Sequence, residues 1–169
     1  MKKYLITIVL ALAACLSLAA QSDVEKLKAM ARNNRVAFDY AVYPDDSPQV
    51  RTSGSAIIDG ECFLITGNGF VVYCDGTTKW SVDGESKEVY IESAGSTKDY
   101  FANPDKWLDC VTGLVYKGKT VSGKYADPDS GDLVSFKFSS LTSMPKGSAS
   151  DFVPDLSDLG SGWVTTDLR

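Results

Sequence analysis

The sequence of 169 residues contains no histidine. This absence removes the most common general base, the most common zinc ligand, and the Ser-His and Cys-His pairs that activate a catalytic nucleophile. Carboxylates remain, but the aspartates of 45–46 and 127–129 stand beside prolines and serines, a composition typical of solvated turns. The sequence therefore predicts a protein that is not an enzyme, with no cofactor and no metal.

Basic residues are also too scattered to form a nucleic-acid-binding surface. The chain has 17 Lys and Arg against 22 Asp and Glu, which gives a formal net charge of −5. A surface that binds phosphates needs clustered cations. We therefore expect no nucleic-acid partner.

The apolar run near the N-terminus predicts a targeting signal over residues 1–20. Two lysines precede an apolar core, and small residues come before Gln21. Removing these 20 of the 169 residues leaves 149, with 15 basic against 22 acidic residues. This length suits one domain with a single hydrophobic core, so we expect one monomeric domain over residues 21–169.

Two signal peptidases could process the signal, with different results. Cleavage after Ala20 would release a soluble periplasmic protein, whereas processing of the stretch "LAAC" as a lipobox would lipidate Cys15 and anchor the protein in the outer membrane, facing the periplasm. A lipidated cysteine is normally followed by a polar tether, but the residues after Cys15 continue the apolar core. The pattern favours release.

Hydrophobic periodicity predicts two helices. The first follows the signal, with Val24, Leu27 and Met30 on one face, and it ends at 33–34. The second begins at 103–104, where a proline follows an asparagine cap, and spans 104–112. Because such a short helix would not be stable in water, its apolar face must pack on the strands.

Alternating and continuous apolar runs bounded by turn residues predict many strands. They are expected near 36–43, 54–59, 61–66, 70–75, 78–82, 87–93, 114–118, 120–126, 133–140, 150–153 and 162–167. The short loops between successive strands require antiparallel pairing. The predicted fold is mainly β with two helices, of the α+β class: a strongly curved antiparallel sheet whose concave side is covered by helices.

Two alternatives remain open for the hairpin around Asn68. A hairpin centred on Asn68 places Cys62 directly opposite Cys74 and predicts a disulfide between them. A two-residue Asn68-Gly69 turn instead places Cys62 opposite Asp75 and leaves the thiols staggered.

The strands on either side of this turn are apolar on both faces, as the segments 62–65 and 70–73 illustrate. An ordinary core covered by helices and loops explains this pattern, and so does a cavity for a hydrophobic ligand. A one-residue error in register would send every strand residue to the opposite face. If the register is as assumed, the predicted cavity residues are Leu27, Phe38, Tyr40, Phe63, Ile65, Val71, Tyr73, Trp80, Val89, Ile91, Trp107 and Leu108.

Several segments taken in order resemble the LolA family of outer-membrane lipoprotein carriers. They are 54–63; 74–80, with "DGTTKW"; 87–91, with "EVYI"; 103–104, with "NP" before a helix; and 163–169, ending in "DLR". The resemblance implies a half-open β-barrel with a helical lid, formed by the first helix and residues 104–112. It also implies a periplasmic carrier that binds the acyl chains of lipoproteins or other lipids. Its partners would be an inner-membrane release complex and an outer-membrane acceptor.

The chain departs from the family pattern at one position. The family commonly has an arginine after the phenylalanine of the second strand, where it ties the lid shut, and here Leu64 follows Phe63. Arg51 lies nearby, but nothing in the sequence transfers that role to it. Two alternatives to the soluble carrier are a membrane-anchored acceptor lipidated at Cys15, as in the related LolB fold, and a scaffold with a filled interior that binds proteins.

Overall fold

The computed structural model describes residues 23–169, except 46, 96–102, 128–129 and 158. The predicted signal and Cys15 lie outside these residues. In the described part of the chain, no helix is both long enough and apolar enough to span a membrane.

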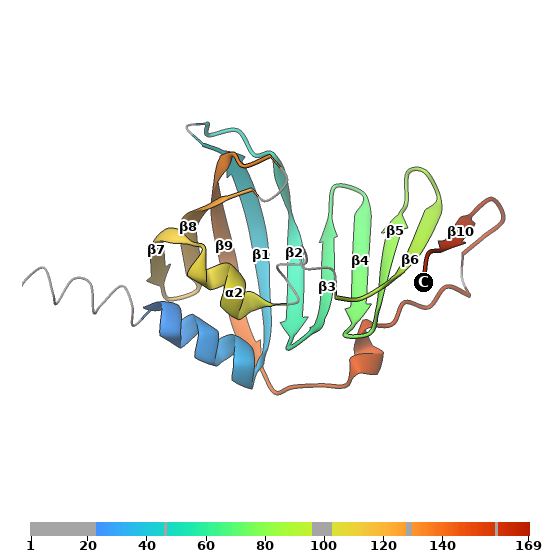
Figure 1. Ribbon diagram of the computed structural model, residues 1–169, viewed down its shortest axis with the longest axis horizontal. Coiled ribbons are helices and arrows are strands. Elements are labelled where there is room, and N and C mark those ends of the chain that lie inside the picture. The colour runs from blue at the N-terminus through green and yellow to red at the C-terminus, as the bar shows by residue number, and fades with distance from the viewer. Residues whose placement is uncertain (1–22, 46, 96–102, 128–129, 158) are drawn as a thin grey trace, which may run out of the picture.

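One sheet carries nearly all of the regular structure (Figure 1). Its strands are β1 (Arg35–Pro44), β2 (Thr52–Asp59), β3 (Cys62–Gly67), β4 (Phe70–Asp75), β5 (Thr78–Asp83), β6 (Glu88–Ser93), β7 (Thr112–Lys117), β8 (Thr120–Ala126), β9 (Leu133–Met144) and β10 (Val164–Asp167). The described helices are an N-terminal helix over residues 23–33, α2 (Pro104–Asp109) and the 3-10 helix η2 (Ala149–Phe152).

The strand order is β10-β6-β5-β4-β3-β2-β1-β9-β8-β7, and the sheet is open. All pairs are antiparallel except β10 with β6. The mainly β fold with two α-helices is thus confirmed. Two details of the prediction are wrong: α2 ends at Asp109, and residues 149–152 form η2 instead of a strand because Ser148 and Asp151 make a capping box there.

The hairpin between β3 and β4 uses the two-residue turn. Asn68 and Gly69 have φ angles of 50° and 82°, as the tight turn requires, and Cys62 therefore pairs with Asp75 while Phe63 pairs with Cys74. Cys62 and Cys74 form no disulfide, so the possible disulfide is wrong and the alternative with staggered thiols is confirmed. The turn places the two side chains on opposite faces of the sheet.

The apolar face of the sheet changes side along the strand order. We call the face that carries Phe38 and Tyr40 the inner face and the other the outer face. Cross-strand pairing shows which other residues share the inner face with Phe38: they are Ala56, Ile65, Val72 and Ser81, in strand order from β2 to β5. The inner face is thus apolar from β1 to β4 and polar on β5 and β6.

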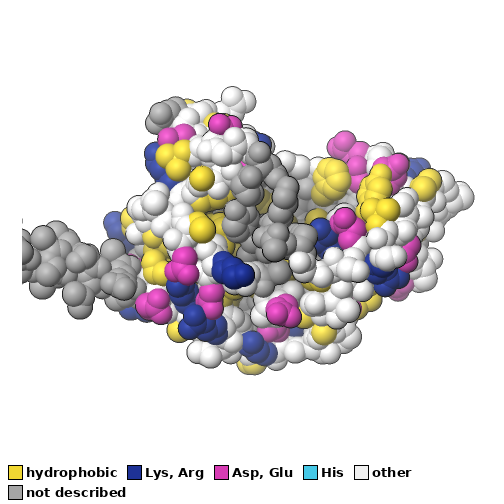
Figure 2. Space-filling model, viewed as in Figure 1, with side chains coloured by type: hydrophobic (Ala, Val, Ile, Leu, Met, Phe, Trp, Pro, Cys, Tyr) yellow, Lys and Arg dark blue, Asp and Glu magenta, His cyan; other side chains and the backbone are white. Residues whose placement is uncertain are grey.

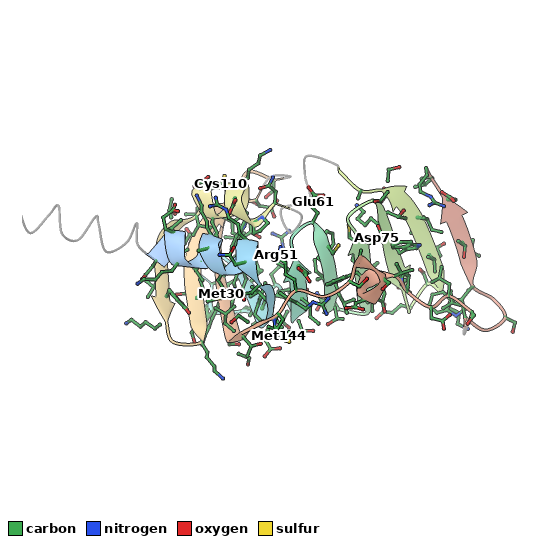
Figure 3. The ribbon with its side chains drawn as sticks, turned by 90° about the horizontal axis from the view of Figure 1, so that it is seen from below. Met30, Arg51, Glu61, Asp75, Cys110 and Met144 are labelled. Atoms are coloured by element: carbon green, nitrogen blue, oxygen red, sulfur yellow. The ribbon has the colours of Figure 1, made fainter. Side chains whose placement is uncertain are left out.

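The outer face shows the reverse pattern. Tyr73 pairs with Trp80, which pairs with Ile91, and Val82 pairs with Val89, which is 0% exposed. These side chains make the outer face apolar from β4 to β6. The connection from β9 to β10 reaches β3 and β4 through η2, and Figure 3 shows it running along the side of the sheet opposite α2.

An ion-pair network fixes this connection to the outer face. The Arg35 guanidinium lies 3.1 Å from the Asp59 carboxylate and 2.7 Å from the Asp151 carboxylate, and it stacks over the ring of buried Phe152. Asp59 also accepts a hydrogen bond from the Gly147 amide. The hydrogen bond from Arg35 is the main cause that lowers the pKa of Asp151.

We predict that Arg35→Ala lowers the free energy of unfolding by about 1–3 kcal/mol, because it leaves the Asp59 carboxylate, only 8% exposed, without its cation. Denaturant unfolding measures this loss. The control is Arg51→Ala, which removes an exposed cation 3.3 Å from Asp127 and should cost less than about 1 kcal/mol. An equal loss in the two variants would contradict the anchoring role of Arg35.

Candidate functional site

A cavity of about 280 Å³ lies between the inner face and two helices. The lining is almost wholly apolar and comes from the N-terminal helix, β1, β2, α2, β8 and β9. Its residues are Leu27, Met30, Ala31, Val36, Phe38, Tyr40, Val42, Thr52, Ile58, Pro104, Trp107, Leu108, Val121, Tyr125, Phe136, Phe138 and Leu141. We call the N-terminal helix and α2 together the helical cover.

Alternation along β1 produces one wall of this cavity. Val36, Phe38, Tyr40 and Val42 are spaced by two residues and therefore point to the same face. On β9, Phe136 and Phe138 do the same.

A β-bulge extends that wall along β9. The register of β9 against β1 shifts between Ala37 and Asp39, and Ser140 has a φ angle of 57°. The extra residue of the bulge brings Leu141 to the inner face, three positions after Phe138. Without it, strict alternation would turn Leu141 outward.

Aromatic rings join α2 to the sheet. The Trp107 ring lies 5.0 Å from that of Phe136 and 5.4 Å from that of Phe138, measured between centroids, and Tyr125 is at 6.0 Å. Gly123 makes room for this cluster, since a Cβ at that position would lie 3.0 Å from the Phe136 ring. These contacts hold α2 over β8 and β9.

Two ion pairs connect the two halves of the helical cover. Lys28 of the N-terminal helix lies 2.5 Å from Asp109 of α2, and Arg32 lies 2.7 Å from Asp105. The four residues recur at one-turn spacing on each helix, so both pairs form along one seam. The hydrogen bond to Asp109 is the main cause that raises the pKa of Lys28 above its ordinary value of 10.5.

Polar groups in the lining gather near Tyr40. Its hydroxyl donates to the Thr66 carbonyl at 3.3 Å, and Thr52, also in the lining, accepts from the Asn68 amide at 2.9 Å. Burial is the main cause that raises the pKa of the Tyr40 phenol. The remainder of the wall offers hydrocarbon and aromatic surface.

The other half of the inner face differs in character. Lys79 and Glu92 form an ion pair of 3.1 Å there, beside Ser81 and half-exposed Tyr90. Figure 2 shows charged side chains among hydrophobic ones at the end of the sheet that carries β5 and β6. The described apolar cavity is confined to the helix-covered half.

Five of the twelve predicted cavity residues line the cavity: Leu27, Phe38, Tyr40, Trp107 and Leu108. Phe63 and Ile65 are on the inner face and belong to the adjoining core, outside the lining. The prediction is wrong for a third group, which lies on the outer face: Val71, Tyr73, Trp80, Val89 and Ile91.

Sequence reasoning missed the contribution of β8 and β9. Val121, Tyr125, Phe136, Phe138 and Leu141 supply much of the wall because β9 pairs with β1 and β8 pairs with β9. The alternation of Val134, Phe136 and Phe138 indicated a strand with one buried, apolar face. Nothing in the sequence paired that strand with β1.

The position of the expected lid-closing arginine faces away from the cover. Leu64 pairs with Ile57 and Tyr73, which places it on the outer face. Arg51 is paired with Asp127 and is not part of the cavity lining. Among the described residues, the two helices of the cover are joined by the ion pairs of Lys28 with Asp109 and of Arg32 with Asp105.

Comparison with models of known protein families gives no match for this chain, and comparison with curated proteins gives none either.

We predict that Lys28→Met loosens the helical cover and accelerates amide hydrogen exchange in residues 23–33. The pKa of Lys28 is raised in the folded protein, so its contribution to stability is present in full below its ordinary value of 10.5 and is lost as the pH rises through the folded-state value. The difference in Tm between the wild type and Lys28→Met should therefore stay constant to about pH 10 and shrink above it.

The matched control for this prediction is Lys26→Met. Lys26 pairs with Asp23 of its own helix and is exposed, so its loss should leave hydrogen exchange of the cover unchanged. If the two lysine variants exchange equally fast, the contact between Lys28 and Asp109 does not hold the cover closed.

Proposed function

We propose that this protein is a periplasmic carrier that binds a hydrocarbon chain of an acylated protein or lipid in the cavity beneath the helical cover. The observation that carries the proposal is the cavity of about 280 Å³ with apolar and aromatic walls. Sheltering a chain from water is favourable by about 0.8 kcal/mol for each buried methylene. An acylated molecule could leave a membrane only for a host of this kind.

The size of the cavity favours one chain at a time. Pockets for small molecules span about 300–1,000 Å³, and this cavity is near the lower limit. A molecule with several acyl chains would need the cover to move further from the sheet. We infer that the described arrangement corresponds to a closed cover over a site for a single chain.

A carrier must also release its cargo, and the cover is built for movement. The N-terminal helix and α2 are joined by two ion pairs that each keep one partner at the surface: Asp109 is 64% exposed and Arg32 is 57% exposed, whereas Lys28 is only 10% exposed. An ion pair with one partner in water is weaker than a fully enclosed pair, so the cover can open without separating two wholly buried charges. Differential binding between open and closed states would then let a partner shift the equilibrium toward release.

The resemblance to the LolA family supports transfer of lipoproteins toward the outer membrane as the biological role. A release complex in the inner membrane and an acceptor in the outer membrane would be the partners. The anchored alternative differs in one covalent feature, a lipid on Cys15. Intact mass of the mature protein separates the two, because cleavage after Ala20 removes Cys15 altogether.

The filled-scaffold alternative receives less support. It requires an interior occupied by the protein's own side chains, whereas the space between Trp107, Leu27 and Tyr40 is a cavity. The aromatic residues of β8 and β9 line this space without closing it.

We predict that Val42→Asp weakens uptake of a fluorescent fatty acid at least about tenfold, because it places an unpaired carboxylate in the cavity wall. Fluorescence titration measures the affinity. Val71→Asp is the control: it makes the same change at a half-buried position on the outer face and should bind as the wild type does.

Circular dichroism and thermal melting must show that both variants are folded. Unchanged binding by folded Val42→Asp would contradict the proposed site. Unfolding of Val42→Asp alone would instead favour an ordinary core at this position.

A further inference from the structure

A row of four residues crosses the inner face at one end of the cavity. Tyr40 of β1 pairs with Gly54 of β2, Gly54 pairs with Gly67 of β3, and Gly67 pairs with Phe70 of β4. Two aromatic side chains on this face are therefore separated by two positions without side chains. The glycines leave a shallow gap across β2 and β3.

The Tyr40 side chain occupies this gap. A Cβ on Gly67 would lie 2.6 Å from the Tyr40 hydroxyl oxygen, so the phenol extends from β1 across β2 as far as β3. A Cβ on Gly54 would overlap the Thr66 carbonyl oxygen. Neither position can carry a side chain without displacing the ring or the neighbouring backbone.

A hydrogen bond holds the ring in place. The Tyr40 hydroxyl donates to the Thr66 carbonyl at 3.3 Å, and the Thr52 side chain lies near the hydroxyl. Thr52 is in turn bonded to Asn68 of the β3–β4 turn at 2.9 Å. The ring is thus fixed to β3 as well as to its own strand.

The cavity ends at this ring, although the apolar surface continues beyond it. Among the described residues, the lining includes Tyr40 and Thr52 but no residue of β3, β4, β5 or β6. In the row of Tyr40, beyond the two glycines, the inner face carries Phe70, which is 49% exposed. Tyr40 therefore lies between the cavity and this exposed apolar end of the same row.

We propose that Tyr40 is the specificity-determining residue of the cavity and sets the length of the hydrocarbon chain that it accepts. This inference rests on the proposed acyl-binding function. A chain that lies along the cavity toward β3 meets the Tyr40 ring as an end wall. Each methylene that finds apolar room strengthens binding about fourfold, and this gain stops where the chain reaches the ring.

The test is a titration with saturated fatty acids from octanoic to stearic acid, each displacing a fluorescent apolar probe from the full mature protein. For the wild type, affinity should rise with chain length and then level off. Tyr40→Phe keeps the ring and should level off at the same length. Tyr40→Ala removes the wall, so its affinity should continue to rise beyond the chain length at which the wild type levels off. Each methylene past that length should strengthen binding to this variant about fourfold.

Two further variants serve as controls, one for loss of folding and one for a general increase in cavity volume. Tyr40→Leu removes the reach of the ring but keeps apolar packing, and it should also extend the limit. Val42→Ala enlarges the cavity at its wall on the same strand and should leave the limit where it is in the wild type.

The outcomes separate this inference from the function on which it rests. An unchanged length limit in folded Tyr40→Ala and Tyr40→Leu overturns the role of Tyr40 while leaving acyl binding intact. An extended limit in Val42→Ala overturns it too, because the effect would then be one of volume. Failure of the wild type to bind any acid of the series overturns both the proposed function and this inference.

Discussion

The need to cover apolar sheet surface on alternate sides governs this structure. From β1 to β4 the inner face is apolar, and from β4 to β6 the outer face is apolar. A single layer of helices could not bury both regions. The chain therefore uses the helical cover on one side and the connection through η2, with buried Phe152, on the other.

The two covers are attached by different forces. On the outer face, Arg35 binds Asp59, which is only 8% exposed, and also Asp151, which is 48% exposed, so one of its two ion pairs is enclosed by the protein. On the inner face, the helical cover is held by aromatic contacts of Trp107 and by two ion pairs that each keep one partner, Asp109 or Arg32, at the surface. The cavity lies under this cover, and the proposed function requires this cover to open.

Local sequence signals predicted most of the fold. Strand positions, the cap of α2 by Asn103 and the apolar face of the N-terminal helix followed from periodicity and turn residues. One turn accounts for the main error in the site. A hairpin centred on Asn68 would align Phe63 with Tyr73, whereas the two-residue turn aligns Phe63 with Cys74.

That one-residue difference sent Tyr73 and the residues in register with it, Trp80 and Ile91, to the outer face. Periodicity could not detect the error because β3 and β4 are apolar on both faces. The preference of Asn-Gly for the two-residue turn was the available signal. The pairing of β9 with β1, which brings Phe138 opposite Tyr40, had no local signal at all.

The most direct test of the central claim is an isotope-filtered nuclear Overhauser measurement on the labelled mature protein with unlabelled palmitate. The account predicts contacts from the acyl chain to ring protons of Trp107 and Phe138, inside the cavity. Contacts confined to Phe70, Tyr90 and Val164, on the uncovered part of the inner face, would contradict it. So would the absence of any contact at saturating palmitate.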